Sequence, residues 1–396
     1  KSLAASAKAI RPSCVVIAGG VHATIAPQDY GLPGVIDVVV RGEGATVMRR
    51  LIPVLEAGGD PGSVANCLSV RSPAFAELAR LGPPELPPLS EAPRPRRDLV
   101  DRARYYCIWS GGRGEKVKTL FPPVATLRTS VGCAFRCSFC VVHFLAHGKY
   151  LQRAPEDVVD EIAALPEEHI YFVDDEMFLN PNRARRMAEL LLERGIRKQY
   201  VSWARSDTIC RHPDIFRLWK QAGLAVVYIG LESMEQQNLE GYDKRVGPDE
   251  NRRAVQTLRE LGIGLHAALM VNPDFDVEDF LKVRKTIDAV APAEISFTVF
   301  SPSPGTPLWE RRRGEFICDD PYSFYDCMHT LLPTRLPLNR FYRYFSLLYL
   351  FGFRQNPWRA NKIRSSLRDF ARVMLRGAYC GWALRRIYRD YDRKYW

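Results

Sequence analysis

The sequence predicts an α/β protein: a partial (β/α)6 barrel, preceded by the C-terminal part of a Rossmann-like domain and followed by a helical extension. Three observations carry this prediction. Short β-branched runs alternate with amphipathic helical stretches between residues 124 and 310. Near the start of the chain, two β-branched runs each lead into a glycine turn. After about residue 310 the alternation stops, and a basic, aromatic pattern of helical character follows.

Residues 1–71 are expected to form the first domain. Strand, glycine turn and helix in succession are typical of a doubly wound sheet, in which ligands bind at the carboxyl ends of strands. Two or three strands are too few for a complete sheet of this kind, so we expect the missing strands upstream of Lys1. The expected elements are a helix over 2–10, strands over 14–18 and 36–40, and a helix over 45–57.

Residues 72–123 are expected to be a linker and an approach segment. Seven prolines fall between residues 73 and 95, and neither a helix nor a central strand tolerates that density of proline. Residues 98–123 show no clear period.

Residues 124–310 are expected to form the barrel. Strand and helix alternate six times, which implies parallel strands with right-handed crossovers, and six units rather than eight favour an open barrel. The expected strands are 124–129, 169–173, 199–204, 225–231, 263–271 and 295–300. The expected helices are 155–165, 181–194, 212–222, 250–261 and 277–290.

Residues 311–396 are expected to form a basic, aromatic extension that is helical over 320–396. Residues 335–396 hold 15 Lys or Arg against three Asp, so the net charge of +11 belongs to this tail and the rest of the chain is near neutral. Such a segment either lies on an anionic membrane or packs its aromatic side chains on the barrel with its arginines in water. The second alternative is the commoner one.

The ten cysteines favour a reducing compartment. Three are bunched at 133–140, and the other seven are scattered, mostly in apolar stretches. No secretory signal pattern precedes the first domain, and the longest apolar run, 345–353, is too short to cross a bilayer. We therefore expect a cytoplasmic protein, with a peripheral contact at the inner face of the membrane left open.

The spacing Cys133-x3-Cys137-x2-Cys140 predicts a metal site on the loop after the first barrel strand. Thiolates bind zinc or iron–sulfur clusters. A zinc site would need a fourth ligand, for which His143 and His147 are candidates. Three cysteines without an obvious fourth favour a [4Fe–4S] cluster with one iron left open.

Other strand ends carry polar residues where they would meet a ligand at the same barrel mouth. Asp174, Asp175 and Glu176 follow the second strand, Arg205 follows the third, and Glu232 and Ser233 follow the fourth. Each has an ordinary structural alternative, as a helix N-cap or an ion-pair partner. Together, around one mouth with an open cluster, they favour a binding site.

The cysteine motif, with Phe139 between its last two cysteines, resembles the signature of radical S-adenosylmethionine (SAM) enzymes. The resemblance covers roughly 124–310. It implies a [4Fe–4S] cluster on the three cysteines and SAM chelated to the fourth iron, whose cleavage gives a radical that abstracts hydrogen from an unactivated carbon. It also implies SAM contacts by Phe139, Asp174, Asp175, Glu176, Arg205, Glu232 and Ser233. Strand five departs from the usual Gly-x-Pro ending, since residues 270–274 are Met-Val-Asn-Pro-Asp.

The first domain resembles the second half of the cobalamin-binding domains that precede some radical SAM barrels. The matching residues are Gly19, Gly20, His22 and Thr24 in one turn and Gly42, Glu43 and Gly44 in the other. A lone histidine after two glycines is more often a hydrogen-bonded loop residue than a metal ligand. The family's Asp-x-His-x-x-Gly lower-ligand motif would lie upstream, so cobalamin is expected in the complete protein.

These resemblances imply a cobalamin-dependent radical SAM enzyme of the class B methyltransferase type, similar to hopanoid C-3 methylases and their relatives. Its expected partners are a small-molecule or lipid substrate and a one-electron donor of the flavodoxin or ferredoxin type. Three alternatives remain: a radical SAM cyclase or adenosyl-lipid ligase without methyl transfer, a tRNA-modifying enzyme, and a non-catalytic zinc or iron–sulfur protein. Nucleic acid is disfavoured because the tail shows no RNA-binding module.

Overall fold

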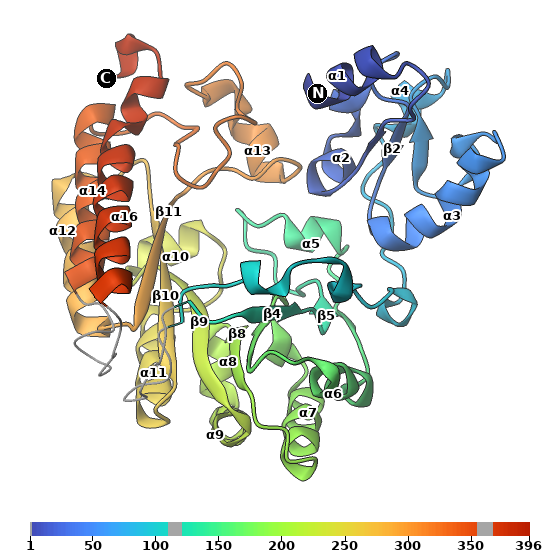
Figure 1. Ribbon diagram of the computed structural model, residues 1–396. Helices are drawn as coiled ribbons and strands as arrows, with labels where there is room; N and C mark the ends of the chain where they lie inside the picture. Colours follow the sequence, from blue (N-terminus) through green and yellow to red (C-terminus); the bar gives the residue numbers. More distant parts are fainter. Residues whose placement is uncertain (1, 110–120, 355–366) are drawn as a thin grey trace.

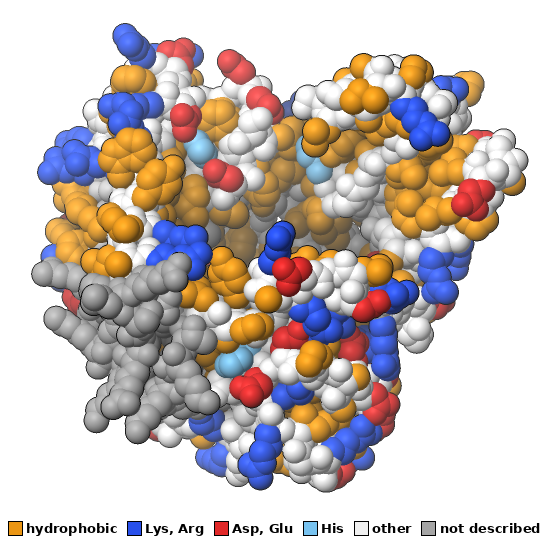
Figure 2. All heavy atoms as spheres, in the orientation of Figure 1, with side chains coloured by type: hydrophobic (Ala, Val, Ile, Leu, Met, Phe, Trp, Pro, Cys, Tyr) orange, Lys and Arg blue, Asp and Glu red, His pale blue; other side chains and the backbone are white. Residues whose placement is uncertain are grey.

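The computed structural model describes residues 2–109, 121–354 and 367–396, which form three parts around a central hollow (Figures 1 and 2). The N-terminal domain lies beside the barrel mouth, and the C-terminal helices stand along the far edge of the barrel (Figure 1). Within the described residues, no helix is long and apolar enough to cross a membrane.

The N-terminal domain is a small sheet with helices around it. Strands β1 (Ile17–Ala18) and β2 (Val38–Val40) pair in parallel, which confirms the expected strand pair in shorter form. Strand β3 (Cys67–Ser69), which we did not predict, pairs with β2 in the antiparallel direction. The helices of this domain are α1 (Ser2–Ile10), α2 (Val21–Ile25) and α3 (Gly44–Glu56).

The linker departs from the prediction at one place. We expected no helix between residues 73 and 95, but α4 (Phe75–Leu78) forms a single helical turn there. The turn lies in the gap between Pro73 and Pro83, where every residue can donate its backbone N–H.

The barrel sheet has six parallel strands in the order β11-β10-β9-β8-β7-β4, as the alternation predicts. Its strands are β4 (Val124–Leu127), β7 (His169–Phe172), β8 (Gln199–Trp203), β9 (Leu224–Glu232), β10 (Gly264–Val271) and β11 (Glu294–Val299). All five expected helices are present as α6 (Pro155–Ala164), α7 (Pro181–Glu193), α9 (Pro213–Ala222), α11 (Pro248–Glu260) and α12 (Val277–Val290).

Several smaller elements of the barrel escaped the sequence analysis. They are the antiparallel pair β5 (Ser130–Val131) and β6 (Leu151–Gln152), and the short helices α5 (Val142–Leu145), α8 (Ser206–Arg211), α10 (Gln236–Gly241) and α13 (Pro307–Arg312). Most of them follow strands of the barrel. They therefore shape the loops at the mouth of the barrel.

The C-terminal extension is helical over α14 (Leu338–Arg354) and α16 (Leu367–Arg386). The expectation of helix from residue 320 is wrong for 320–337, where Pro321, Pro333 and Pro337 interrupt the backbone and the chain forms turns. Phe341 and Phe345 of α14 are buried in the main core, so this helix packs on the barrel as the commoner alternative predicts. Lys1, Trp358 and the 110–120 part of the approach segment lie outside the described residues.

Candidate radical SAM site

The cysteine loop is clamped at the barrel mouth by backbone-directed contacts. The backbone N–H of Ser138 donates to the carbonyl of Tyr242 (3.0 Å), and the Ser303 hydroxyl donates to the carbonyl of Phe139. The N–H of Gly132 donates to Asp175 Oδ2 (2.8 Å). Gly132 has a φ of +91°, and a Cβ there would lie 2.2 Å from the Lys149 carbonyl oxygen, so only glycine fits. Loops after three different strands thus fix one short segment.

The three thiols of this loop are free and close to one another. Cys137 is buried, and Cys133 and Cys140 are half-buried. Burial raises the pKa of the Cys140 thiol to about 11, and the nearby Cys137 and Cys133 thiols act in the same direction. Three thiolates can therefore coexist here only with a strongly positive partner, which suits an iron–sulfur cluster.

The two histidines that we considered as zinc ligands, His143 and His147, have different surroundings from each other. The ring of His147 is hydrogen-bonded through Nε2 to the Pro83 carbonyl (2.7 Å), in the linker. The Nδ1 atom of His143 is buried without a hydrogen-bond partner. Among the described residues, no three His, Cys, Asp or Glu side chains surround a point that would hold a single metal ion.

Arg205 connects the end of β8 to the cysteine loop. Its Nη1 lies 3.8 Å from Cys137 Sγ, and its guanidinium carbon lies 3.6 Å from the centre of the Phe135 ring. Its remaining donors reach Asp207 Oδ1 (2.9 Å) and the Lys244 carbonyl (2.8 Å). The residue expected to meet the SAM carboxylate is therefore held against the cluster loop.

The three acids after β7 have different surroundings. Asp174 accepts hydrogen bonds from Thr129 and Ser130, so it joins β7 to the loop after β4. Asp175 holds Gly132, as described above. Glu176 is 1 % exposed, and its Oε2 accepts the backbone N–H of Arg205 (2.6 Å).

The second carboxylate oxygen of Glu176, Oε1, is buried and has no hydrogen-bond partner. Burial raises the pKa of this carboxyl group to about 8. A buried acceptor without a donor is costly, and an amine beside it would satisfy it. Of the three acids, Glu176 therefore fits the methionine amine of SAM best.

Glu232 and Ser233, after β9, are held by neighbours that the sequence did not suggest. Glu232 Oε1 pairs with Lys244 Nζ at 2.7 Å, and both side chains are largely buried. Glu232 has a φ of +57°, at a shift in the β9–β10 register. The Ser233 hydroxyl accepts from the N–H of Glu235 and from Asn238, so it caps a turn. Nothing in the sequence around Lys244 signalled this buried pair.

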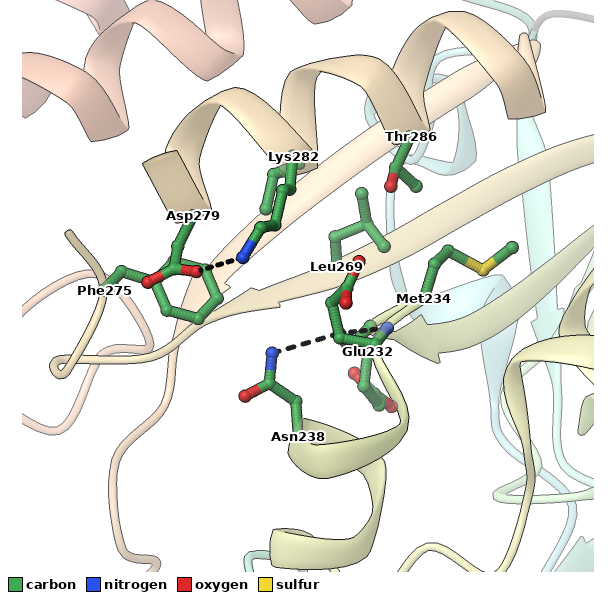
Figure 3. Close-up of a pocket in the computed structure, with 11 residues that line it drawn as sticks. Glu232, Met234, Asn238, Leu269, Phe275, Asp279, Lys282 and Thr286 are labelled. Carbon is green, nitrogen blue, oxygen red and sulfur yellow. Dashed lines mark hydrogen bonds and ion pairs between the residues drawn. The ribbon is translucent and has the colours of Figure 1, made fainter. Parts of the chain in front are cut away.

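Glu232 and Ser233 also line a small pocket at this strand end. It lies between α10, α12 and the ends of β9 and β10, where Asp279 and Lys282 pair with each other (3.1 Å) (Figure 3). A larger cleft of approximately 450 Å³ opens beside it at the ends of β10 and β11, with Tyr242, Asn272 and Phe300 in its lining. The departure from Gly-x-Pro after β10 therefore lies in the wall of this cleft.

Phe139 reaches an apolar cluster at this edge of the mouth. It packs against a group formed by Tyr242, Met270, Phe300 and Leu332, and its ring lies 6.0 Å from that of Tyr242, edge to face. This cluster supplies a dry surface beside the cysteine loop.

The two glycine turns of the N-terminal domain lie side by side. The Thr24 hydroxyl accepts the N–H of Gly42 (2.9 Å) and donates to the Gly20 carbonyl (2.8 Å). Glu43 caps helix α3 by accepting the N–H of Thr46. No atom lies within 4 Å of a Cβ placed on Gly20 or Gly44, so the backbone there is open to a bulky ligand, whereas Gly19 lies near Val40.

His22 is a hydrogen-bonded loop residue. Its Nε2 lies 2.8 Å from Asp29 Oδ2, and its ring lies 4.4 Å from that of Tyr322 in the C-terminal part. Glu43 also faces the barrel, with Oε1 3.7 Å from Arg128 Nη2. These contacts place the glycine turns beside the barrel mouth.

Comparison with known proteins identifies the class of the barrel. Residues 127–287 match the radical SAM superfamily, so the chain contains a radical SAM domain. The cysteine loop, Glu176 and Arg205 all lie within this match.

The curated relatives include methylases, methyltransferases and cyclases. The chain is 30% identical over 344 residues to a hopanoid C-3 methylase of Methylococcus capsulatus, covering 86% of this chain and 63% of that protein. It is 28% identical to an anaerobic magnesium-protoporphyrin IX monomethyl ester cyclase of Cereibacter sphaeroides, covering 89% of this chain and 58% of the cyclase. The chain thus spans less than two thirds of the length of these relatives.

Solved structures share the fold. The cobalamin- and [4Fe–4S]-bound radical SAM methyltransferase TsrM of Kitasatospora setae matches with a TM-score of 0.52 at 20% identity, over 74% of this chain and 58% of that one. The cobalamin-dependent radical enzyme OxsB matches with a TM-score of 0.56 at 18% identity, over 87% of this chain and 50% of that one. The fold of a cobalamin-dependent radical SAM enzyme is confirmed.

Proposed function

We propose that this chain belongs to a cobalamin-dependent radical SAM enzyme that methylates an unactivated carbon. The observation that carries the proposal is the barrel mouth: three clamped thiols, Arg205 against Cys137, and a buried Glu176 oxygen without a donor. The relationship to a hopanoid methylase favours methyl transfer over the alternatives.

Each residue has a defined task in this proposal. Cys133, Cys137 and Cys140 hold the cluster, Glu176 Oε1 accepts from the SAM amine, and Arg205 meets the SAM carboxylate. When bound, the cluster and SAM supply a radical that removes a hydrogen atom from the substrate, and cobalamin supplies the methyl group. The apolar cluster around Tyr242 excludes water from the radical.

The cobalamin contacts are part of the same proposal. The open backbone at Gly20 and Gly44, tied together through Thr24, faces the barrel mouth, where the methyl group is needed. The hydrogen bond from His22 to Asp29 supports an orienting role for this histidine rather than metal ligation.

The full-length protein, reconstituted anaerobically with iron and sulfide, tests this function. With dithionite, cobalamin and SAM, we expect 5′-deoxyadenosine and a product one methyl group heavier than the substrate, and the Cys137→Ala variant should give neither. A product without an added methyl group would support the cyclase alternative. The similarity of this chain to a cyclase of Cereibacter sphaeroides favours that alternative. Uptake of one zinc ion and no iron would refute the proposal of a radical SAM enzyme and support the non-catalytic zinc protein.

We further propose a lipid substrate and a peripheral membrane contact through the outer face of α16. On this face Leu375, Tyr379 and Trp382 are 71%, 69% and 54% exposed, and their spacing of four and three residues puts them on one side of the helix. Arginine side chains surround them, and no acidic residue lies between residues 371 and 389. Figure 2 shows hydrophobic side chains (orange) next to Lys and Arg side chains (blue) over this part of the surface.

An apolar stripe bordered by arginines suits an anionic lipid surface. Gly377 and Gly381 on the opposite side of α16 are buried, and a Cβ on Gly381 would lie 3.6 Å from Leu350 of α14. The exposed stripe is therefore not needed for the helix pair. Sedimentation with vesicles tests the contact. We expect binding to vesicles with 30% phosphatidylglycerol, weaker binding in high salt, and loss of binding in Leu375→Ser/Trp382→Ser. Unchanged binding of this variant would exclude the α16 face.

A further inference from the structure

One lysine connects two of the residues that are expected to contact SAM. Lys244 lies on the loop between α10 and α11, and its side chain is 5% exposed. Its Nζ lies 2.7 Å from Glu232 Oε1 and also donates to the Gly230 carbonyl. Its backbone carbonyl accepts a hydrogen bond from Arg205 Nη2 (2.8 Å). Lys244 therefore contacts Glu232 with its amine and Arg205 with its main chain.

The amine of Lys244 has a fixed place, because it meets the carboxylate beside a glycine. A Cβ placed on Gly230 would lie 2.3 Å from Glu232 Oε1 and 3.0 Å from Lys244 Nζ. A larger residue at this position would displace one of the two charged groups. The Glu232 side chain is 14% exposed, and charged groups that are so largely buried need each other as partners.

The backbone around this ion pair is strained. Glu232, Asp243 and Arg245 have φ angles of +57°, +46° and +56°. Residues with a Cβ adopt this left-handed region infrequently, and they stay there only where surrounding contacts hold them. Asp243 and Arg245 are the chain neighbours of Lys244 on either side. The buried side chain of Lys244 is therefore a contact that holds the strained backbone on both sides of it.

The same loop reaches the cysteine loop in two ways. The Tyr242 carbonyl accepts the backbone N–H of Ser138 (3.0 Å). Arg205, which donates to the Lys244 carbonyl, lies with its Nη1 3.8 Å from Cys137 Sγ. A shift of the loop would therefore move the guanidinium of Arg205 relative to the thiols.

We propose that Lys244 is a positioning residue for SAM: its buried amine holds the strained loop, and the loop carbonyl orients Arg205 toward the SAM carboxylate. This inference rests on the proposed function, which assigns Arg205 to that carboxylate. Lys244 itself contacts no part of SAM. When the amine is removed, the left-handed backbone on both sides relaxes and the carbonyl moves away from Arg205. The stability of the fold and the recognition of SAM are then two separable effects of one residue.

Binding of SAM and of decarboxylated SAM to the full-length protein, reconstituted anaerobically, tests this role. Equilibrium dialysis measures both affinities, and their ratio reports how well the carboxylate is held. We expect the wild type to prefer SAM by about tenfold or more, the effect of one charge-assisted hydrogen bond. Lys244→Met should lower this preference roughly three- to tenfold, because Arg205 loses its fixed orientation.

Two further variants separate positioning from stability. Lys244→Met/Glu232→Gln removes both charges of the buried pair, so it should regain most of the stability that Lys244→Met loses, while the preference for SAM stays low. Lys8→Met is the matched control in the N-terminal domain. Lys8 also pairs with a carboxylate, that of Asp37 (2.6 Å), and donates to a backbone carbonyl, that of Cys14. This control should keep the wild-type preference for SAM.

The outcomes distinguish the role of Lys244 from the proposed function. A wild-type preference for SAM in Lys244→Met, or its return in the double variant together with stability, would show a purely structural lysine and overturn the proposal. An equal drop in Lys8→Met would overturn it as well, since the effect would then not depend on Arg205. If the wild type bound neither compound, the proposed function itself would be refuted.

Discussion

The carboxyl group of Glu176 gives the sharpest test of the SAM site, through the substitution Glu176→Gln. Its Oε2 already accepts the N–H of Arg205, and its Oε1 has no partner. A glutamine has one oxygen and one NH2 group where the carboxylate has two oxygens, so it presents an acceptor at the Arg205 position or at the SAM position, and a donor at the other. An amine beside Glu176 favours the ionised form of the carboxyl group, so the variant loses one charge-assisted hydrogen bond in the SAM complex. That loss is worth about 1.5–3 kcal/mol, or roughly 10- to 150-fold in SAM affinity.

The same substitution should have the opposite effect on the stability of the SAM-free protein at high pH. The pKa of Glu176 is raised from 4.5 to about 8 by burial, so in this window the folded protein holds a proton that the unfolded chain has lost. Wild-type stability therefore contains a contribution that falls as pH rises through this window. Glutamine does not titrate, so the variant should gain stability relative to the wild type between pH 5 and pH 8.5.

Two measurements check this pair of effects. Anaerobic equilibrium dialysis with labelled SAM gives the affinity, and thermal unfolding without SAM at several pH values gives the stability. Glu77→Gln, in the one-turn helix α4, is a control in which neither quantity should change. If SAM affinity were unchanged, or if the variant lost relative stability as pH rose, the assignment of Glu176 would be refuted.

Three other predictions concern the loop and its supports. Cys137→Ala should lower iron content after reconstitution to near background, and iron at wild-type level would contradict the cluster assignment. Gly132→Ala should lower iron content strongly and abolish SAM cleavage, because its Cβ would meet the Lys149 carbonyl; normal iron content would show that the loop tolerates the change. Lys244→Met leaves Glu232 largely buried without its partner and should lower the unfolding free energy by about 3–5 kcal/mol in denaturant titrations, whereas a loss under 1 kcal/mol would mean that water replaces the amine.

The contacts of Arg205 show how the fold brings residues that are far apart in the sequence into one site. In the chain, Arg205 lies 68 residues after Cys137, yet the two side chains meet at 3.8 Å. The parallel sheet produces this proximity, since all its strands end at one edge. The same edge carries Ser303, whose hydroxyl donates to the carbonyl of Phe139. Nothing in the sequence marks Ser303 beyond its place after a strand.

The sequence by itself determined the order of strands and helices in the barrel and the chemistry of the cysteine loop. Hydrophobic periodicity depends on near neighbours in the chain, so all six strands and five crossover helices were predictable. A three-thiol motif is also local, and its spacing alone favours a cluster. Prediction was wrong for residues 320–337 and for α4, where local proline positions decide the backbone.

Tertiary structure decided which polar side chains are left to bind. The sequence offers three consecutive acids, Asp174, Asp175 and Glu176, as equal candidates for the SAM amine. In the structure, Asp174 accepts a hydrogen bond from Thr129 and Asp175 accepts one from Gly132. Of these three acids, only Glu176 keeps a buried carboxylate oxygen without a donor. Such a difference depends on donors far away in the chain, and no local pattern encodes it.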